Sequence, residues 1–223
     1  MAQFIGIDVS EQRGCAIAAL NEDGSSSGSL WCRSSVLDVV AAIQGLSGPV
    51  EVVIGIDSPR QPLSAPRPWY WNSRTNQWRS RKTTEQGWGR HCEVVVSSLR
   101  LANPQWSRPL DVTPNWMRFG FELFVALDQV GRVHEVFPSA SYTQLSAVPA
   151  PVLQVSLAEV SRGPKDLLDA HVAALTALEF EMGRGSAVGD GDLLGTIVLP
   201  RPVGSAPAEL LTWPKQHTER RGR

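Results

Sequence analysis

The sequence predicts an α/β domain in which helices flank a mixed β-sheet, and three observations support this prediction. Short apolar runs rich in β-branched residues alternate with segments of helical spacing along the 223-residue chain. The run at 50–57 is apolar without alternation, which is typical of a strand buried on both faces. The order of three strands, a helix, a strand, an insertion, helices, a strand and a helix fits a sheet with helices on its faces.

The N-terminal part of the chain predicts four strands and one helix. Residues 3–9 are short, apolar and β-branched, and the strands expected at 14–20 and 28–33 follow as a hairpin or meander. Helical spacing over 36–43 ends at glycines, before the buried strand at 50–57.

The rest of the chain predicts further helices and two short strands. The predicted segments are helices at 90–101 and 114–129, a strand at 132–137 that Pro138 ends, a helix at 165–182 and a strand at 195–199. The helix at 165–182 is the clearest, because Pro164 is well placed near its first turn. We expect residues 1–205 to form a single domain and residues 206–223 to form a polar, basic, disordered tail.

Composition restricts the class of protein. Hydrophobic residues make up 42% of the chain and charged residues 19%, the balance of a soluble globular protein with a sizeable core. No run approaches the roughly 20 apolar residues of a membrane span, and the N-terminus lacks the features of a signal peptide. Cys15, Cys32 and Cys92 are an odd, widely spaced set without a disulfide framework. We therefore expect a cytoplasmic protein with no membrane partner.

Acidic residues lie at or near the ends of three predicted strands. Asp8 ends the first strand, Asp57 ends the fourth, and Glu135 lies in the strand at 132–137. Functional groups in α/β sheets gather at the carboxyl ends of parallel strands. The late helix adds Asp166 and Asp169, whose i,i+3 spacing places both on one helical face. We expect these acids to form one site.

Carboxylates gathered in one place need a counter-charge, and this predicts a divalent metal. Mg²⁺ or Mn²⁺ prefers hard oxygen ligands and would remove the repulsion between them. Two such ions about 3.5–4 Å apart can activate water and stabilise a leaving oxygen in phosphodiester cleavage. Taken singly, Asp8 and Asp57 also suit turns after strands, and Asp166 suits the start of a helix. Glu135 alone also suits a solvent-facing position on an edge strand.

An ordered set of short motifs resembles a known family. The motifs are Gly6-Ile7-Asp8, Ile56-Asp57-Ser58-Pro59, Arg90-His91-Cys92-Glu93, Glu135-Val136-Phe137-Pro138 and Asp166-Leu167-Leu168-Asp169-Ala170-His171. They resemble the predicted ribonuclease H-like nucleases, a family described as a domain of unknown function and related to the Holliday-junction resolvases. The likeness covers most of residues 3–200, but 146–163 matches poorly and the expected lysines before the late helix are absent apart from Lys165.

The resemblance implies a ribonuclease H-like sheet and a set of metal ligands. In the wider superfamily an acid on the first strand, one on the fourth strand and a pair on the late helix bind the metals. The matching residues here are Asp8, Asp57, Asp166 and Asp169. Glu135 matches the family's own Glu-Val-x-Pro pattern. The resemblance also makes Arg90 a candidate phosphate contact, although Arg90 and Glu93 could equally form an ordinary surface pair on a helix.

A Trp- and Arg-rich insertion follows the fourth strand at about 58–89, and we expect it to be a long functional loop. Its candidate nucleic-acid contacts, with Arg90 just beyond it, are Arg60, Arg74, Arg79, Arg81, Lys82, Arg90 and Trp78. Bases stack on aromatic rings while arginines pair with phosphates, so this mixture suits single-stranded or distorted nucleic acid. The tryptophans could equally pack the insertion onto the domain, with arginines covering them through cation–π contacts.

These features predict a nuclease that hydrolyses phosphodiester bonds with Mg²⁺ or Mn²⁺ in a two-metal carboxylate site. Its partner would be nucleic acid, either DNA or RNA, and a junction-like substrate would suit a homodimer. A non-catalytic nucleic-acid or protein binding module on the same fold is the alternative. An actin-like sugar kinase or ATPase is disfavoured, because the 223 residues contain no second Gly-x-Asp-x-Gly-Thr element.

Overall fold

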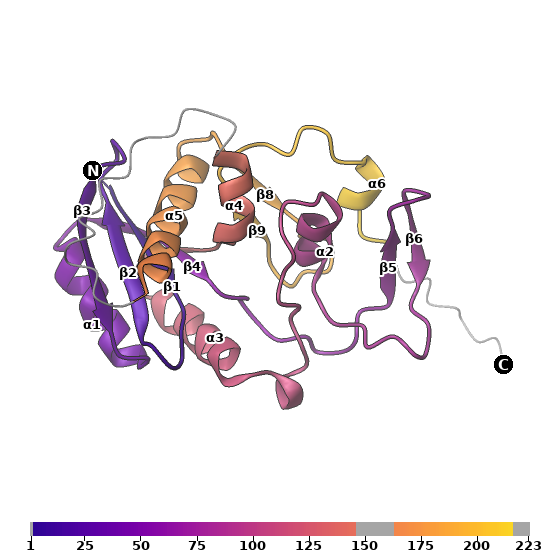
Figure 1. The fold of residues 1–223 in the computed structure, drawn as a ribbon, viewed down its shortest axis with the longest axis horizontal. Coiled ribbons are helices and arrows are strands. Elements are labelled where there is room, and N and C mark those ends of the chain that lie inside the picture. Colours follow the sequence, from indigo (N-terminus) through magenta and orange to yellow (C-terminus); the bar gives the residue numbers. More distant parts are fainter. Residues whose placement is uncertain (1, 146–162, 216–223) are drawn as a thin grey trace.

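The computed structural model describes residues 2–145 and 163–215, and a five-stranded sheet lies at its centre. The strands of this sheet are β1 (Ala2–Asp8), β2 (Cys15–Leu20), β3 (Ser26–Cys32), β4 (Glu51–Asp57) and β7 (Arg132–Glu135). They lie in the order β3-β2-β1-β4-β7 (Figure 1). β1, β2 and β3 form an antiparallel meander, whereas β1, β4 and β7 are parallel. The sheet is therefore mixed, as the sequence predicts.

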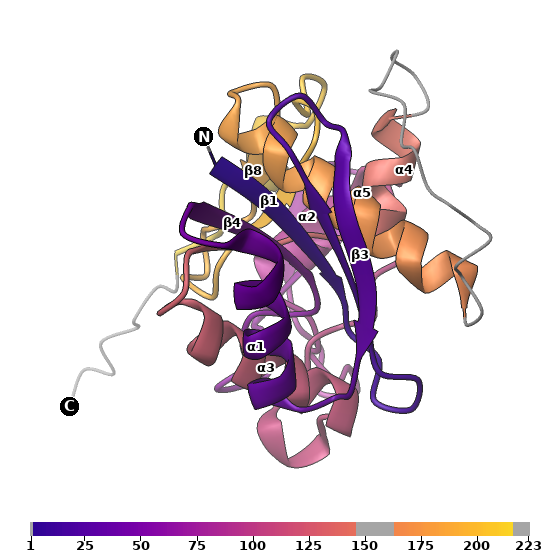
Figure 2. The same cartoon turned by 90° about the vertical axis from the view of Figure 1, so that its left-hand side faces the viewer.

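Helices cover both faces of the sheet (Figure 2). The covering helices are α1 (Val36–Ser47), α3 (Asn115–Leu127) and α5 (Pro164–Glu181). Ile5 and Ile54 point to one face and pack with α1 and α3. Phe4 and Val53 point to the other face and pack with α5. Successive side chains of a strand alternate between faces, so the unbroken apolar runs of β1 and β4 serve two cores at once.

Two glycines let α5 lie unusually close to the sheet. Gly6 of β1 and Gly55 of β4 are register partners on the face that α5 covers. A Cβ atom added to Gly6 would lie 1.8 Å from the carbonyl oxygen of Ala170, and one added to Gly55 would lie 2.6 Å from that of Ala173. Only glycine permits this backbone approach, so the Gly-x-Asp pattern of both strands has a packing cause beside its acidic residue.

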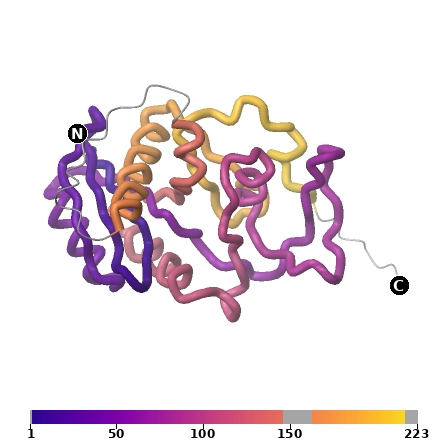
Figure 3. The backbone as a smooth tube through the Cα atoms, viewed as in Figure 1, coloured from indigo at the N-terminus to yellow at the C-terminus, as the bar shows by residue number. Residues whose placement is uncertain are grey.

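A second, smaller core lies at the other end of the molecule (Figure 3). Its elements are the hairpin β5 (Trp69–Asn72) and β6 (Gln77–Ser80), helix α2 (His91–Ser98), the hairpin β8 (Ser186–Val188) and β9 (Ile197–Leu199), and helix α6 (Ala208–Leu211). Val95 and Ile197 are among its buried residues, and Trp71 and Trp78 pack against them. The insertion therefore contains a hairpin that packs on this core, flanked by loop on both sides, where the sequence predicted a long loop or insertion.

Several short elements were not predicted from the sequence. They are the β5–β6 hairpin, the 3₁₀ turn Leu110–Val112, α4 (Pro138–Leu145), β8 and α6. Pro138 ends the preceding strand, as expected, but it also opens α4, a position that tolerates proline.

The C-terminal region also differs from its prediction. The expectation of a disordered tail is wrong for α6 and for Trp213, whose ring packs on Trp78. The remainder of that predicted tail, 216–223, lies outside the described residues, as does most of the poorly matching stretch 146–163. In the part of the chain that the structure describes, no helix has the length and apolarity needed to cross a membrane.

Candidate metal centre

The carboxylates of Asp8 and Asp57 lie side by side at the carboxyl ends of β1 and β4. The two residues are direct register partners in a parallel pair, so their side chains point to the same face of the sheet. That face is the one against which α5 packs, because Gly6 and Gly55 lie two residues earlier on the same strands and therefore on the same face. The strand register thus aims both carboxylates at the first turns of α5.

Asp169 completes a cluster of three carboxylates. One oxygen each from Asp8, Asp57 and Asp169 lies within 4.8 Å of the other two. Opposite ligands of an octahedral Mg²⁺ lie about 4.2 Å apart, so the spacing is close to that of oxygens around one ion. Two parallel strands and one helix therefore bring together the three acids whose convergence the sequence predicts.

The triad is electrostatically unfavourable without a cation. Burial, helped by the negative charges of Asp166 and Asp169, raises the pKa of Asp8 to about 7. Burial, helped by Asp8 and Asp169, raises the pKa of Asp57 well above its ordinary value. Both shifts have the sign expected for carboxyls that are desolvated and crowded by like charge. A divalent ion would supply the counter-charge that favours the ionised forms.

Two neighbouring side chains hold Asp169. The hydroxyl of Tyr142, from α4, donates a hydrogen bond to Oδ1 of Asp169 at 2.9 Å. The ammonium group of Lys165, one turn earlier on α5, pairs with Oδ2. Burial and the bond to Asp169 raise the pKa of Tyr142 above its usual range, which keeps it a donor. No sequence motif indicated Tyr142, because only the folding of α4 against α5 brings it to the site.

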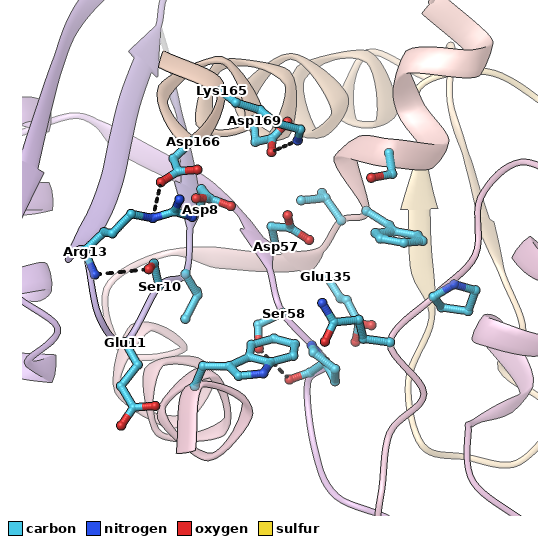
Figure 4. A pocket seen from close by; sticks show the side chains of 18 of the residues that line it. Asp8, Ser10, Glu11, Arg13, Asp57, Ser58, Glu135, Lys165, Asp166 and Asp169 are labelled. Atoms are coloured by element: carbon cyan, nitrogen blue, oxygen red, sulfur yellow. Dashed lines mark hydrogen bonds and ion pairs between the residues drawn. The ribbon is translucent and has the colours of Figure 1, made fainter. Parts of the chain in front are cut away.

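Asp166 lies beside the triad but is engaged elsewhere (Figure 4). Its Oδ2 forms an ion pair of 2.9 Å with Nε of Arg13, which lies in the turn between β1 and β2. Asp166 contributes the larger of the two like-charge effects on the pKa of Asp8, so the two carboxyls are near neighbours. The i,i+3 spacing does place Asp166 and Asp169 at one cavity, but in different roles.

Glu135 faces away from the triad. Its register partner in β4 is Ile56, so its side chain points to the face opposite that of Asp57. It is buried, and both of its oxygens accept from the guanidinium of Arg90, with Nη1 at 2.7 Å from Oε2. Its Oε2 also accepts from the backbone N–H of Arg60 at 2.8 Å. Glu135 is therefore buried and not solvent-facing, although it lines the same cavity as the triad. Its role as a catalytic acid stays a prediction.

Arg90 belongs to the same buried network. Its side chain is 0% exposed and also pairs with Glu93, with Nη2 at 2.9 Å from Oε1. Ser107 donates its backbone N–H to Glu93 at 2.9 Å and accepts from Nε of Arg90 at 3.0 Å. Arg90 and Glu93 thus form neither an exposed surface pair nor a phosphate contact in this conformation. Their network ties the start of α2 to the end of β7.

A cavity of about 810 Å³ opens beside the triad. Figure 4 shows Asp8, Asp57 and Asp169 pointing into it. Its walls come from the turn after β1, the segment after β4, α2 and the loop after it, the end of β7, the starts of α3, α4 and α5, and β9. Side chains that line it beyond the acids include Arg13, Gln105, Trp116 and Lys165. The carboxylates therefore line a cavity large enough for a small ligand or one nucleotide.

The arginines and tryptophans of the insertion are largely engaged within the protein. Arg79 pairs with Glu85 at 2.5 Å and covers the ring of Tyr70, and Arg60 pairs with Asp128 at 2.8 Å. Trp78 donates its indole N–H to the carbonyl of Glu209 at 2.7 Å and packs edge-on against two tryptophans and His91. For these residues the packing interpretation describes the geometry better than a nucleic-acid surface.

Three basic residues of the insertion remain on the surface. Arg74, Arg81 and Lys82 are exposed, although Arg81 donates a hydrogen bond to the carbonyl of Glu85 at 2.9 Å. They are the candidates from the predicted nucleic-acid set that an outside phosphate can reach.

Comparison with protein-family models, with curated proteins and with solved structures finds no match for this chain. The likeness to ribonuclease H-like nucleases therefore rests on the sequence motifs. What the site can do must be argued from its geometry and chemistry.

Proposed function

We propose that this protein is a metal-dependent nuclease with a ribonuclease H-like fold, and that Asp8, Asp57 and Asp169 hold its divalent cation. The observation that carries the proposal is the convergence of three carboxylate oxygens within 4.8 Å at one wall of a cavity. Such crowding is costly in the folded protein unless a bound cation compensates it.

The donor set favours Mg²⁺ or Mn²⁺. All three side chains offer carboxylate oxygens, and neither thiol nor imidazole belongs to the cluster among the described residues. Hard oxygen donors of this kind suit Mg²⁺ and Mn²⁺ better than zinc or copper. When bound, such a cation would lower the pKa of a coordinated water and stabilise the leaving oxygen of a phosphodiester.

Asp166 supplies the ligand for a second ion in this proposal. It lies close enough to Asp8 to raise that residue's pKa, and among the described residues it forms an ion pair with the exposed side chain of Arg13 alone. Exchange of Arg13 for a cation would give a two-metal site in which Asp8 is shared. Arg13 and Lys165, released from their acids, would then be available to the substrate's phosphates.

Fold and motif order support the same proposal. The acids lie on the first strand, the fourth strand and the late helix, which is the arrangement that the family resemblance implies. Glu135 departs from it, because its carboxylate is used by Arg90. The alternative of a sugar kinase or ATPase gains no support, since the described residues form one large sheet and two short hairpins without a second half-domain.

Thermal denaturation with and without Mn²⁺ tests the metal site. We expect Mn²⁺ to stabilise the wild type by roughly 2.7 kcal/mol at a concentration one hundred times its Kd. Asp57→Asn should lose most of this gain because it removes a ligand charge. Asp111→Asn makes the same change at an exposed position outside the cavity and should respond like the wild type.

Cleavage of labelled single-stranded, duplex, hybrid and branched substrates, in DNA and RNA, tests the activity. Mn²⁺-dependent cleavage that Asp57→Asn abolishes would support the nuclease. Stabilisation by Mn²⁺ without cleavage of any substrate would favour the non-catalytic binding module. An equal Mn²⁺ response of wild type and Asp57→Asn would exclude the proposed ligand set.

A further inference from the structure

Trp116 contributes a partly exposed aromatic side chain to the lining of the cavity. It lies in the first turn of α3, is half-exposed and lines the same cavity as the triad. Within residues 2–145 and 163–215 its ring takes part in no aromatic pair and no cation–π contact. The tryptophans that do take part are Trp71, Trp78, Trp88, Trp106 and Trp213. The large, flat side chain of Trp116 is thus available for a ligand.

Two exposed basic side chains lie at the same cavity. The side chains of Arg13 and Lys165 are 61% and 71% exposed, and each pairs with one acid at the cavity wall. Because they are exposed at their outer ends, both can move to an incoming anion at little desolvation cost. An aromatic side chain and two basic side chains that can move, beside a carboxylate cluster, suit a ligand that combines a flat ring with a phosphate.

The size of the cavity restricts how nucleic acid can enter. A volume of about 810 Å³ falls within the range of pockets for small ligands, and the cavity is bounded by segments from both cores of the protein. A stacked base pair inside a duplex presents only its edges to a protein, so its flat face cannot reach a pocket side chain. Contact between a base and Trp116 therefore requires a single strand or a base turned out of its stack.

We propose that the cavity takes one unpaired nucleotide of a nucleic-acid strand, with the base stacked on Trp116 and the phosphate toward Asp8, Asp57 and Asp169. The position of the phosphate rests on the proposed function, whereas stacking of the base on Trp116 is measured separately from cleavage. Gln105, which lines the same cavity, carries both donors and an acceptor for the edge of the base. The substrate class is single-stranded or locally unpaired nucleic acid.

Replacing Trp116 in two ways separates stacking from packing. Trp116→Phe keeps an aromatic face, whereas Trp116→Leu keeps apolar bulk without one. The probe is a mixed-sequence single-stranded DNA oligonucleotide with one 2-aminopurine, compared with the same strand carrying one abasic position and with a duplex. Binding is followed by anisotropy and by 2-aminopurine fluorescence in Ca²⁺. Trp69→Leu is the matched control, a half-buried tryptophan of the insertion that does not line the cavity.

We expect Trp116→Leu to weaken single-strand binding by about tenfold or more, since one stacked base contributes on the order of 1–3 kcal/mol. Trp116→Phe should retain most of the affinity, and Trp69→Leu all of it. The 2-aminopurine signal should be quenched by wild type and Trp116→Phe, but not by Trp116→Leu. Melting temperatures should stay close together for all variants.

Three results would overturn the inference. They are equal affinity of Trp116→Leu and Trp116→Phe, tighter binding of the duplex than of the single strand, and loss of affinity with Trp69→Leu instead. None of these depends on cleavage, so the nuclease proposal can fail while stacking holds. Conversely, Mn²⁺-dependent cleavage that is unaffected by Trp116→Leu would remove the stacking site and leave the nuclease.

Discussion

At the scale of single residues, the site is a balance of charges between a few side chains. Lys165 and Tyr142 hold Asp169, and Arg13 holds Asp166. Among the described residues no ion pair holds Asp8 or Asp57, and burial and like charge outweigh the more distant positive charges of Lys165 and Arg13. The unfavourable charge is thereby concentrated on the two strand-end carboxyls. Those are the residues whose protonation should respond most to pH and to metal.

Replacing Asp8 should change how stability depends on pH. The folded-state pKa of Asp8, about 7, lies above the unfolded value of about 4. Its contribution to stability is therefore fully present below about pH 4 and is lost as pH rises through 7. Without metal, Asp8→Asn should match the wild type near pH 4 and melt at a higher temperature at pH 8.

Melting curves of both proteins in EDTA between pH 4 and pH 8 check this. A constant difference across that range would mean that Asp8 titrates normally and is a turn residue. In Mn²⁺ the order at pH 8 should reverse, because only the wild type keeps the full ligand set.

At the scale of secondary-structure elements, two devices position the acids. Glycines in β1 and β4 let α5 approach, and the buried Arg90 network joins α2 to β7. The first acts on the face that carries the triad, and the second on the opposite face. Each can be tested against a matched substitution elsewhere in the fold.

Gly6→Ala should displace α5 from the sheet. The new methyl group would meet the carbonyl oxygen of Ala170 at 1.8 Å, and we expect a loss of at least about 1–3 kcal/mol in the free energy of unfolding. The Mn²⁺ response should fall as well, since Asp169 moves with the helix. Gly45→Ala, in α1 with open space around it, should be neutral or stabilising by about 0.5–1 kcal/mol.

Chemical denaturation of the two variants, with and without Mn²⁺, measures both effects. Retention of full stability by Gly6→Ala would show that the helix-to-sheet approach is looser than described. If Gly6→Ala were less stable but responded to Mn²⁺ as the wild type does, the packing of α5 on the sheet would not control the position of Asp169.

Arg90→Met should be strongly destabilising because it leaves Glu93 and Glu135 buried without their cation. Loss of one partner of a buried ion pair typically costs about 3–5 kcal/mol. Arg132→Met removes a half-exposed arginine that pairs with Glu51 and Glu181, and should cost only about 0–1 kcal/mol. Urea denaturation compares the two, and similar losses would contradict a structural role for Arg90.

At the scale of the whole molecule, the sheet with its acids and the aromatic insertion occupy opposite ends, with the cavity between α5 and the loop after α2 (Figure 1). Arg67 and Arg79 of the insertion stabilise that end through ring contacts and an ion pair, whereas Arg60 contacts Asp128 and Phe124 beside the sheet. Arg74, Arg81 and Lys82 are exposed, and they would offer further positive charge to nucleic acid if the proposed binding holds.

The salt dependence of binding tests this arrangement. Replacing Arg74, Arg81 and Lys82 together by Ala should flatten the plot of log affinity against log salt, by roughly 0.7 for each lost phosphate contact on a single strand. Arg132→Ala removes an exposed charge at the start of β7, on the edge of the sheet opposite the carboxylates, and should leave the slope unchanged. An unchanged slope in the triple variant would assign these charges to solubility.

Local sequence patterns were enough to predict the order of the main elements and the acids at the strand ends. The spacing of apolar residues, the glycines that end a helix and Pro164 at a helix start are local signals. The bounds of β1 to β4, α1, α3 and α5 were therefore predicted to within a few residues. Asp8, Asp57 and Asp169 followed from those elements, because strand ends and helix faces are fixed by local periodicity. The short elements β5, β6, α4, β8 and α6 were missed because their formation depends on packing against distant segments.

Which acids share a site depends on how the elements pack. Glu135 differs from Asp57 by one step of strand register, and a one-residue step turns a side chain to the other face of the sheet. The side chains of Arg90 and Trp78 suit a surface by their polar or amphipathic character. Partners distant in the sequence nevertheless bury Arg90 and pack around Trp78. Tyr142 and Trp116 reach the cavity for the same reason: contacts between distant segments are set by how the elements pack, which local sequence does not encode.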